Sequence, residues 1–177
     1  MTKVLAENGG MIPAWVDGAL VPVEKLAVHQ RGLRHKAVSV FLFAGERLLI
    51  QQRAAGKYHT PGLWANTCCT HPHWDEAAGD CARRRLGEEL GITGVALEPR
   101  GELTYRADVG GGLVEHEEVS LFRVDCAAEP QVVATPAEVQ AIRWVTLDAL
   151  AAEIEAAPER FTPWIRIYMA EHRHLIA

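Results

Sequence analysis

The chain has 177 residues, of which 49% are hydrophobic and 23% are charged, a composition typical of folded globular proteins and not of disordered or fibrous ones. Its net charge of -5 argues against a nucleic-acid-binding protein, because such a protein carries a dense basic face. The absence of an apolar run long enough to cross a bilayer argues against a membrane protein. Because a chain of this length is the size of one domain, one globular domain over residues 1–177 is expected.

The N-terminal segment and the cysteines indicate the compartment. MTKVLAENGG, at residues 1–10, lacks the apolar core of a signal peptide, which predicts a cytoplasmic protein. The four cysteines show no repeated C-x-x-C pattern, and adjacent cysteines rarely bridge each other, so reduced thiols are expected at Cys68, Cys69, Cys81 and Cys126. A monomer is the expected state, with a dimer as the alternative.

Two hairpins open the chain. The segments MIPAWV and LVPV flank the turn signal Asp17-Gly18, which predicts the first hairpin. The second joins residues 36–43 to residues 47–53 through Ala44-Gly45-Glu46. Because KAVSVFLF at 36–43 is apolar on both faces, it is predicted to be a central strand.

The rest of the chain mixes strands with a few helices. A helix over residues 76–90 is predicted, with Asp75 as its N-cap and Gly91 as its stop. The other predicted elements, in chain order, are a loop at 54–65, a strand at 66–70, strands at 95–106 and 114–124 separated by the loop ADVGGG, a strand at 139–145, and helices at 147–157 and 164–174. This order predicts an α+β sandwich.

The helix over 76–90 carries an inward carboxylate. Its apolar stripe consists of Ala78, Ala82, Leu86 and Leu90. Glu89 flanks this stripe and Glu88 points nearly opposite. A purely structural interpretation pairs Arg84 with Glu88 and Arg85 with Glu89 on a solvated face, and for Glu88 that interpretation is preferred.

Strand alternation separates the residues of TCCTHPH at 67–73 and of VEHEEVSLF at 114–122. Cys69 and His71 share one face of their strand, and Cys68 points away. Glu115 and Glu117 share an inward face with Val119 and Leu121, whereas His116 and Glu118 fall on the other side. Two carboxylates on a core-facing side are costly unless they are paired or bind a metal.

Two further histidines precede the central strand, His29 and His35. A single histidine is more often a structural residue than a ligand. Three imidazoles and two carboxylates together suit one Mn²⁺, Zn²⁺ or Mg²⁺ ion, and the set would be His29, His35, His71, Glu115 and Glu117. The residue pattern leaves open whether these distant segments meet.

The run from Thr70 to Ile92 resembles a Nudix box. The matching positions are Glu76, Arg84, Leu86, Glu88, Glu89, Gly91 and Ile92. Thr70 replaces the first Gly of the motif, and Arg85 replaces a Glu that is a metal ligand in Nudix pyrophosphohydrolases. Because an arginine does not bind Mg²⁺, the scaffold is expected but pyrophosphohydrolysis is in doubt.

From about Trp15 to Trp164 the chain is similar to the type I isopentenyl-diphosphate isomerases of the Nudix superfamily. The motifs that carry the resemblance are His29 with His35, QQRAAGKYHTPGLWANTCCTHP, the altered box at 70–92, LTYRAD, LVEHEEV and FTPW. The resemblance implies a Nudix-fold α/β/α sandwich with a mixed β-sheet and flanking helices. It also implies interconversion of isopentenyl and dimethylallyl diphosphate through a carbocation-like intermediate.

The resemblance implies a role for each residue of the site. The metal ligands are those positions that match His29, His35, His71, Glu115 and Glu117, and Glu89 helps to bind a diphosphate-associated Mg²⁺. Cys69 and Glu117 match the proton-transferring pair, Tyr105 assists Glu117, and Trp164 stabilises the cation by a cation–π interaction. The diphosphate is bound by Lys25, Arg53, Lys57 and Arg85, where Arg85 supplies positive charge in place of a hydrolytic ligand.

The sequence leaves two other functions as alternatives. A Nudix pyrophosphohydrolase acting on a nucleoside diphosphate derivative is disfavoured by Arg85. A non-catalytic module with a structural zinc site would use Cys68, Cys69, His71 and His73, but strand alternation directs these side chains apart.

Overall fold

One long strand, β3 (His35–Ala44), organises the sheet. The computed structural model describes residues 10–177; residues 1–9, which hold most of the segment assessed for a signal peptide, lie outside the described part. In the nine-stranded sheet β3 pairs with four strands, β1 (Met11–Val16), β4 (Arg47–Arg53), β6 (Cys68–Thr70) and β8 (Leu113–Cys126). The pairing with β8 is parallel and the other three are antiparallel, so the sheet is mixed and β3 is central, as predicted.

The first hairpin leads into a helix that the sequence analysis missed. β1 pairs with β2 (Ala19–Glu24) around Asp17 and Gly18, whose φ values of 50° and 82° confirm the predicted turn. α1 (Lys25–Arg31) follows at once. The Glu24 carboxylate caps it by accepting from two backbone N–H groups, and Gly32 ends it at φ 61°. This seven-residue helix places His29 in its last turn.

The expected loop ADVGGG is largely strand. β7 (Glu98–Gly110) and β8 form one long antiparallel hairpin, and only Gly111 and Gly112 lie between them. The prediction of a separating loop was wrong because alternation continues through it: Val109 and Leu113 both remain buried. The three glycines, at φ 85°, 64° and 74°, are needed for the reversal itself. The predicted strands at 66–70 and 139–145 correspond to β6 and β9 (Val139–Thr146), and β5 (Trp64–Ala65) pairs with β4.

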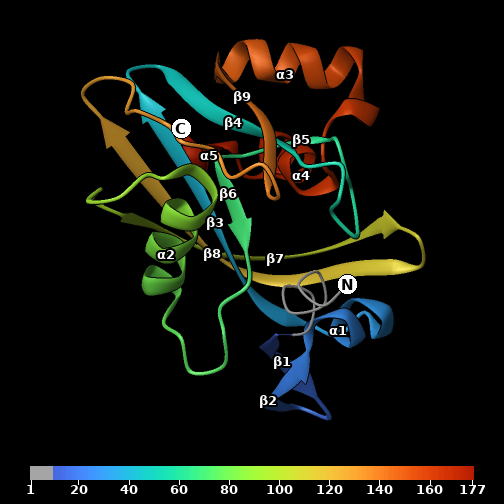
Figure 1. The fold of residues 1–177 in the computed structure, drawn as a ribbon. Helices are drawn as coiled ribbons and strands as arrows, with labels where there is room; N and C mark the ends of the chain where they lie inside the picture. Colours follow the sequence, from blue (N-terminus) through green and yellow to red (C-terminus); the bar gives the residue numbers. More distant parts are fainter. Residues whose placement is uncertain (1–9) are drawn as a thin grey trace.

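Helices cover both faces of the sheet (Figure 1). α2 (Ala78–Leu90) packs on one face over a core that includes Leu86 and Leu90. The other face is covered by α3 (Leu147–Ala156), the 3-10 turn η1 (Pro158–Arg160), α4 (Pro163–Glu171) and α5 (Arg173–Ile176). The α/β/α sandwich is therefore confirmed, although the helix predicted at 164–174 is divided at His172. Among the helices of residues 10–177, none combines the length and the apolar character needed to span a membrane.

The start of α2 differs from the prediction. Asp75 has φ 64° and does not cap the helix; the N-cap position is Ala77, which has no side-chain acceptor. The neighbouring carboxylate of Glu76 instead accepts the backbone N–H of His73 at 2.8 Å and two N–H groups of Arg84 at 2.6 and 2.8 Å. Gly91 ends the helix at φ 66°, as predicted.

The Glu76–Arg84 pair makes a testable contribution to stability. The hydrogen bonds that the Glu76 carboxylate accepts from Arg84 lower the pKa of Glu76 from 4.5 to about 2. Because the folded-state pKa is depressed, the stabilisation is fully present above pH 4.5 and is lost as the pH falls toward 2. Glu76→Gln is expected to lower the free energy of unfolding by about 1 kcal/mol at pH 7, measured by urea denaturation.

Lowering the pH should reduce the difference in the free energy of unfolding between Glu76→Gln and the wild-type protein. Glu88→Gln is the control, because Glu88 pairs with the same arginine but is 47% exposed. A loss in Glu76→Gln that is the same at every pH would contradict this role of the carboxylate.

Candidate active site

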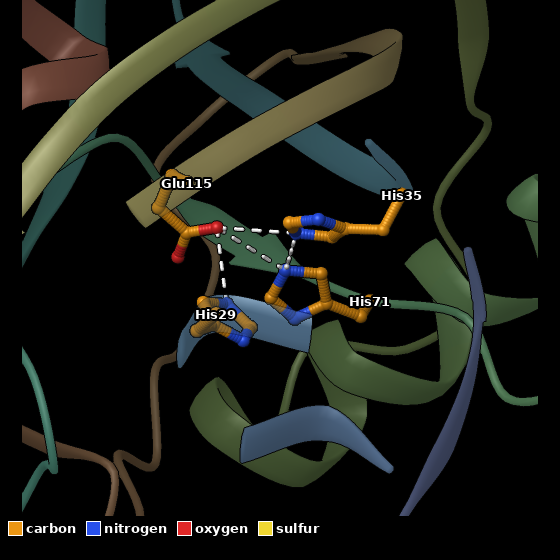
Figure 2. A group of neighbouring side chains, drawn as sticks. All are labelled: His29, His35, His71 and Glu115. Carbon is orange, nitrogen blue, oxygen red and sulfur yellow. Dashed lines mark hydrogen bonds and ion pairs between the residues drawn. The ribbon is translucent and has the colours of Figure 1, made fainter. Parts of the chain in front are cut away.

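Three histidines and a carboxylate from four separate elements meet in the interior (Figure 2). His29 lies in α1, His35 begins β3, His71 follows β6 and Glu115 lies on β8. Glu115 Oε2 is 3.1 Å from His29 Nε2, 3.2 Å from His35 Nε2 and 3.7 Å from His71 Nε2. One potential ligand atom of each residue lies within 4.8 Å of the others. The predicted segments therefore do meet.

The register of the sheet explains this meeting. In the parallel ladder His35 of β3 lies opposite Glu117 of β8, which places Glu115 one inward position away. On the other edge of β3, Ser39 lies opposite Cys69 of β6, and His71 follows two residues later. As predicted, Cys69 packs with the core under α3–α5, whereas Cys68 is buried in the core under α2.

The orientation of the rings makes the group fit a divalent cation. Nδ1 of His29 donates to the Lys25 carbonyl at 2.6 Å, and Nδ1 of His35 donates to the Leu33 carbonyl at 2.8 Å. In the neutral rings each Nε2 therefore presents a lone pair to the Glu115 carboxylate, which is also only an acceptor. Acceptors that face one another in a buried site are unfavourable unless a cation lies among them. This chemistry fits a resident metal ion.

Glu117 stands beside Glu115 with different partners. Its Oε1 lies 3.0 Å from His71 Nε2, and its Oε2 accepts the Tyr105 hydroxyl at 2.7 Å. Burial and the adjacent charge of Glu115 raise the pKa of Glu117 well above its ordinary value. Burial opposes ionisation of Glu115 too, but when no ion is bound, hydrogen bonds from imidazole N–H groups hold its pKa well below the usual range. The pKa values of the two carboxyl groups thus shift in opposite directions, so Glu115 stays an anion and Glu117 is able to carry a proton.

Cys69 presents a protonated thiol to the same site. Burial, and next the charge of Glu117, raise the pKa of this thiol well above its ordinary value. Behind it, Ser39 Oγ lies 2.7 Å from Cys69 Sγ and 2.9 Å from the Tyr168 hydroxyl. The thiol is therefore held in place from the core side and open to the cleft on the other.

A single cleft collects most of the predicted site residues. It is lined by Lys25, Gln51, Arg53, Lys57, Tyr58, His59, Cys69, Thr70, His71, Arg85, Glu89, Glu115, Glu117, Glu138 and Trp164. Among the predicted residues only Tyr105, His29 and His35 are absent from this lining, and each contacts a carboxylate that belongs to it. One cavity therefore holds proton carriers, an aromatic ring and a set of cations.

The cations at the mouth of the cleft are held in different ways. Arg53 donates to the His59 carbonyl at 3.1 Å, and its guanidinium lies 5.3 Å from the centre of the Trp164 ring. Its buried Nε has no partner among the described residues. Burial, and next the charge of Lys57, lower the pKa of Lys25 to about 8. A bound anion would satisfy Arg53 and relieve the repulsion between the lysines.

Arg85 and Lys57 share a carboxylate that the sequence analysis did not identify, Glu138. Arg85 donates to Glu138 at 3.1 Å and to Glu89 at 2.7 Å, and Lys57 pairs with Glu138. Glu89 is buried, as predicted, and also accepts from Gln51 at 2.9 Å. The Arg85–Glu89 contact of the purely structural interpretation is thus present, but Glu89 is buried and not on a solvated face, and both cations are positioned by carboxylates.

The alternative structural zinc site is not formed. Cys68 is buried on the α2 side of the sheet, and the side chain of His73 is 63% exposed. Among residues 10–177 the potential metal-binding group includes neither of them. His71 belongs to that group, whereas Cys69 does not.

His59 and Glu138 are the main functional candidates that the sequence did not reveal. His59 lies in a loop whose sequence has no periodicity. Its partner, Glu115, is 56 positions further along the chain, and His59 Nε2 lies 3.1 Å from Glu115 Oε1. Glu138 is a single acidic residue immediately before β9, and only the tertiary fold brings it to Lys57. The one available signal was the clustering of a histidine, a tyrosine and a proline in KYHTP.

Comparisons with known proteins find similar sequences over most of the chain. The model of the NUDIX domain matches residues 33–165. A protein of Cereibacter sphaeroides named isopentenyl-diphosphate Delta-isomerase is 64% identical over 166 residues, which cover 94% of each chain. A protein of the same name from Rhodobacter capsulatus is 57% identical, again over 94% of each chain.

Solved structures share the fold at low sequence identity. A Deinococcus radiodurans protein superposes with a TM-score of 0.71 at 16% identity, over 90% of this chain and 96% of that one. The dihydroneopterin triphosphate pyrophosphohydrolase of Escherichia coli gives a TM-score of 0.57 at 21% identity, over 77% and 93%. These likenesses concern the fold alone.

Metal binding can be tested through stability. An ion that binds only the folded chain stabilises it by about 3 kcal/mol at about 100 times its Kd, so Mn²⁺ or Zn²⁺ should raise the Tm of the metal-free protein. Glu115→Gln keeps the shape of the side chain and removes its charge, and it is expected to abolish most of this rise. Glu118→Gln, on the other face of β8, should behave as wild type. An undiminished rise in Glu115→Gln would contradict a site centred on this carboxylate.

Proposed function

The chain belongs to the isopentenyl-diphosphate Delta-isomerases of the NUDIX family, and from that premise we propose that it interconverts isopentenyl and dimethylallyl diphosphate in isoprenoid biosynthesis. The observation that supports this most is the pair of buried proton carriers, Cys69 and Glu117, in one cleft with a set of cations. A hydrocarbon isomerisation needs an acid and a base and no nucleophile.

The proposed reaction moves a double bond by two proton transfers. One member of the Cys69–Glu117 pair gives a proton to the terminal methylene carbon, and the π electrons form the new C–H bond. This leaves a tertiary cation at the neighbouring carbon. The other member takes a proton from the carbon on the diphosphate side, whose C–H electrons become the new double bond. In the reverse direction the two roles exchange, so atoms and charge balance.

Tyr105 and Trp164 support these transfers. The Tyr105 hydroxyl, at 2.7 Å from Glu117, orients the carboxyl group and compensates its charge when it loses a proton. Trp164 is buried in the wall of the cleft, and an indole face stabilises a nearby cation by about 2 kcal/mol when water is excluded. Exclusion of water also protects the cation from capture, which would give an alcohol.

A divalent ion would be held by His29, His35, His71, Glu115 and Glu117, and Mn²⁺, Zn²⁺ and Mg²⁺ all suit these ligands. When bound, the ion supplies positive charge that fixes Glu117 and tunes its acidity. Glu89 is the proposed contact for a second ion, a Mg²⁺ that accompanies the diphosphate. The cytoplasmic location, the monomeric state and the single domain of residues 1–177 stay predictions from sequence.

The diphosphate is assigned to the four cations at the cleft, Lys25, Arg53, Lys57 and Arg85. Arg53 is best placed for direct contact because its buried Nε lacks a partner among the described residues. Arg85 occupies the position where a hydrolase of this fold carries a metal-binding Glu, and its guanidinium is already bound to Glu89 and Glu138. Hydrolysis of the diphosphate is therefore not expected.

Substitution of either proton carrier should abolish isomerisation. With purified protein, isopentenyl diphosphate and Mg²⁺, we expect Cys69→Ala and Glu117→Gln each to lower kcat by at least about 100-fold, because each removes a general acid–base group. Cys68→Ala is the matched control, since this thiol faces the opposite core, and it should stay active. Turnover that survives both substitutions would rule out the assignment, and release of phosphate would favour a hydrolase instead.

Loss of a diphosphate-binding cation should act on substrate binding. Arg53→Gln is expected to raise KM by about 10- to 100-fold, the value of one charge-assisted hydrogen bond, with a smaller change in kcat. Arg47→Gln is the control because Arg47 is exposed and pairs with Glu129 outside the cleft. An unchanged KM in Arg53→Gln would place the diphosphate elsewhere.

A further inference from the structure

A fourth buried histidine, His59, stands beside the three predicted ligands. It lies between β4 and β5 and is only 6% exposed. Its ring stacks on that of His29 with 5.6 Å between centroids, and it lies nearly perpendicular to the Trp164 ring with 5.9 Å between centroids. Neither the proton transfers nor the ligand set described above uses this side chain.

The two oxygens of Glu115 have different neighbours. Oε2 faces the Nε2 atoms of the three predicted ligands, whereas Oε1 lies 3.1 Å from Nε2 of His59. Because a carboxylate only accepts, His59 Nε2–H must be the donor of this bond. The ring keeps this tautomer because its Nδ1 is then free to accept the hydroxyl of Thr60, which lies at 3.0 Å.

His59 does not share the point at which the other imidazoles converge. The group of potential ligand atoms that lie within 4.8 Å of one another contains His29, His35, His71 and Glu115 but not His59. Within residues 10–177 its carboxylate contact is on the far oxygen of Glu115. The side chain is therefore placed to orient a ligand and not to act as one.

We propose that His59 is a positioning residue that holds the Glu115 carboxylate with Oε2 directed at the three histidines. This role rests on the metal site under the proposed function. A carboxylate that is held by one oxygen cannot rotate away from the ion, so the site is formed before the ion arrives. Loss of a hydrogen bond that orients a metal ligand commonly weakens metal binding by about 10- to 100-fold.

The backbone around His59 is shaped for this placement. Thr60 has φ 47°, a left-handed conformation that a β-branched residue seldom adopts. This turn directs the Thr60 hydroxyl to His59 Nδ1, and the carbonyl of His59 accepts Arg53 at 3.1 Å. One residue thus holds a metal ligand through its ring and a diphosphate-binding cation through its backbone. A change of side chain should disturb the first contact and spare the second.

Three substitutions separate this role from packing. His59→Gln keeps an N–H near the position of Nε2, His59→Asn has a similar amide that is too short to reach Glu115, and His59→Phe keeps only the ring. Metal-free wild type and variants are titrated with Mn²⁺, followed by electron paramagnetic resonance, and with Zn²⁺, followed by chelator competition. His174→Phe, an exposed histidine in α5, controls for binding at surface imidazoles.

We expect His59→Asn and His59→Phe to bind the ion about 10- to 100-fold more weakly and His59→Gln to retain most of the affinity. KM for isopentenyl diphosphate should change little in any of them at saturating metal, because the carbonyl that holds Arg53 remains. Equal affinity in wild type, His59→Asn and His59→Gln would overturn the role of His59 while the metal site stands. Absence of binding in wild type would overturn both. His59→Asn and His59→Gln remain comparable to each other even if His59→Phe does not fold.

Discussion

The buried carboxylate of Glu115 is the constraint on which the rest of the site depends. A carboxylate that is 2% exposed loses its hydration, and it is stable only where other groups favour its charge. Two of the histidines at its Oε2 donate elsewhere through Nδ1, which leaves their Nε2 lone pairs directed at it. Positive charge among these acceptors, from a metal ion or from protons on the rings, resolves this arrangement. The metal site is thus a consequence of the hydrogen bonds behind the ligands as much as of the ligands themselves.

From this constraint follows the chemistry of the second carboxylate. Burial, and next the charge of Glu115, raise the pKa of Glu117, and burial raises the pKa of the Cys69 thiol, so each group is able to carry a proton. The reaction needs one of the two protonated and the other ionised. Both side chains face one cleft, and the proposed protonation of an alkene there would require that water is excluded when substrate is bound. The fold contributes by bringing both to β3, Glu117 through the parallel ladder with β8 and Cys69 through β6.

Local periodicity predicted much of this, and its failures have a common cause. Alternation along β6 placed Cys69 correctly, and the helical wheel placed Glu89 inward, because both depend only on neighbours in sequence. Asp75 is of a residue type that commonly caps helices. The backbone is left-handed there, however, and the neighbouring Glu76 carboxylate accepts hydrogen bonds from Arg84 in α2. His59 and Glu138 act through partners that only the tertiary fold supplies, so no local pattern distinguishes them.

X-ray absorption spectroscopy of the protein loaded with one equivalent of Zn²⁺ or Mn²⁺ tests the central claim most directly, because it reports the atoms bound to the ion. The predicted first shell contains three imidazole nitrogens, recognised by their multiple scattering, with the remaining positions filled by oxygen. A shell with sulfur, which would indicate Cys69 or Cys68, or one with oxygen alone would contradict a site built by His29, His35 and His71 around Glu115.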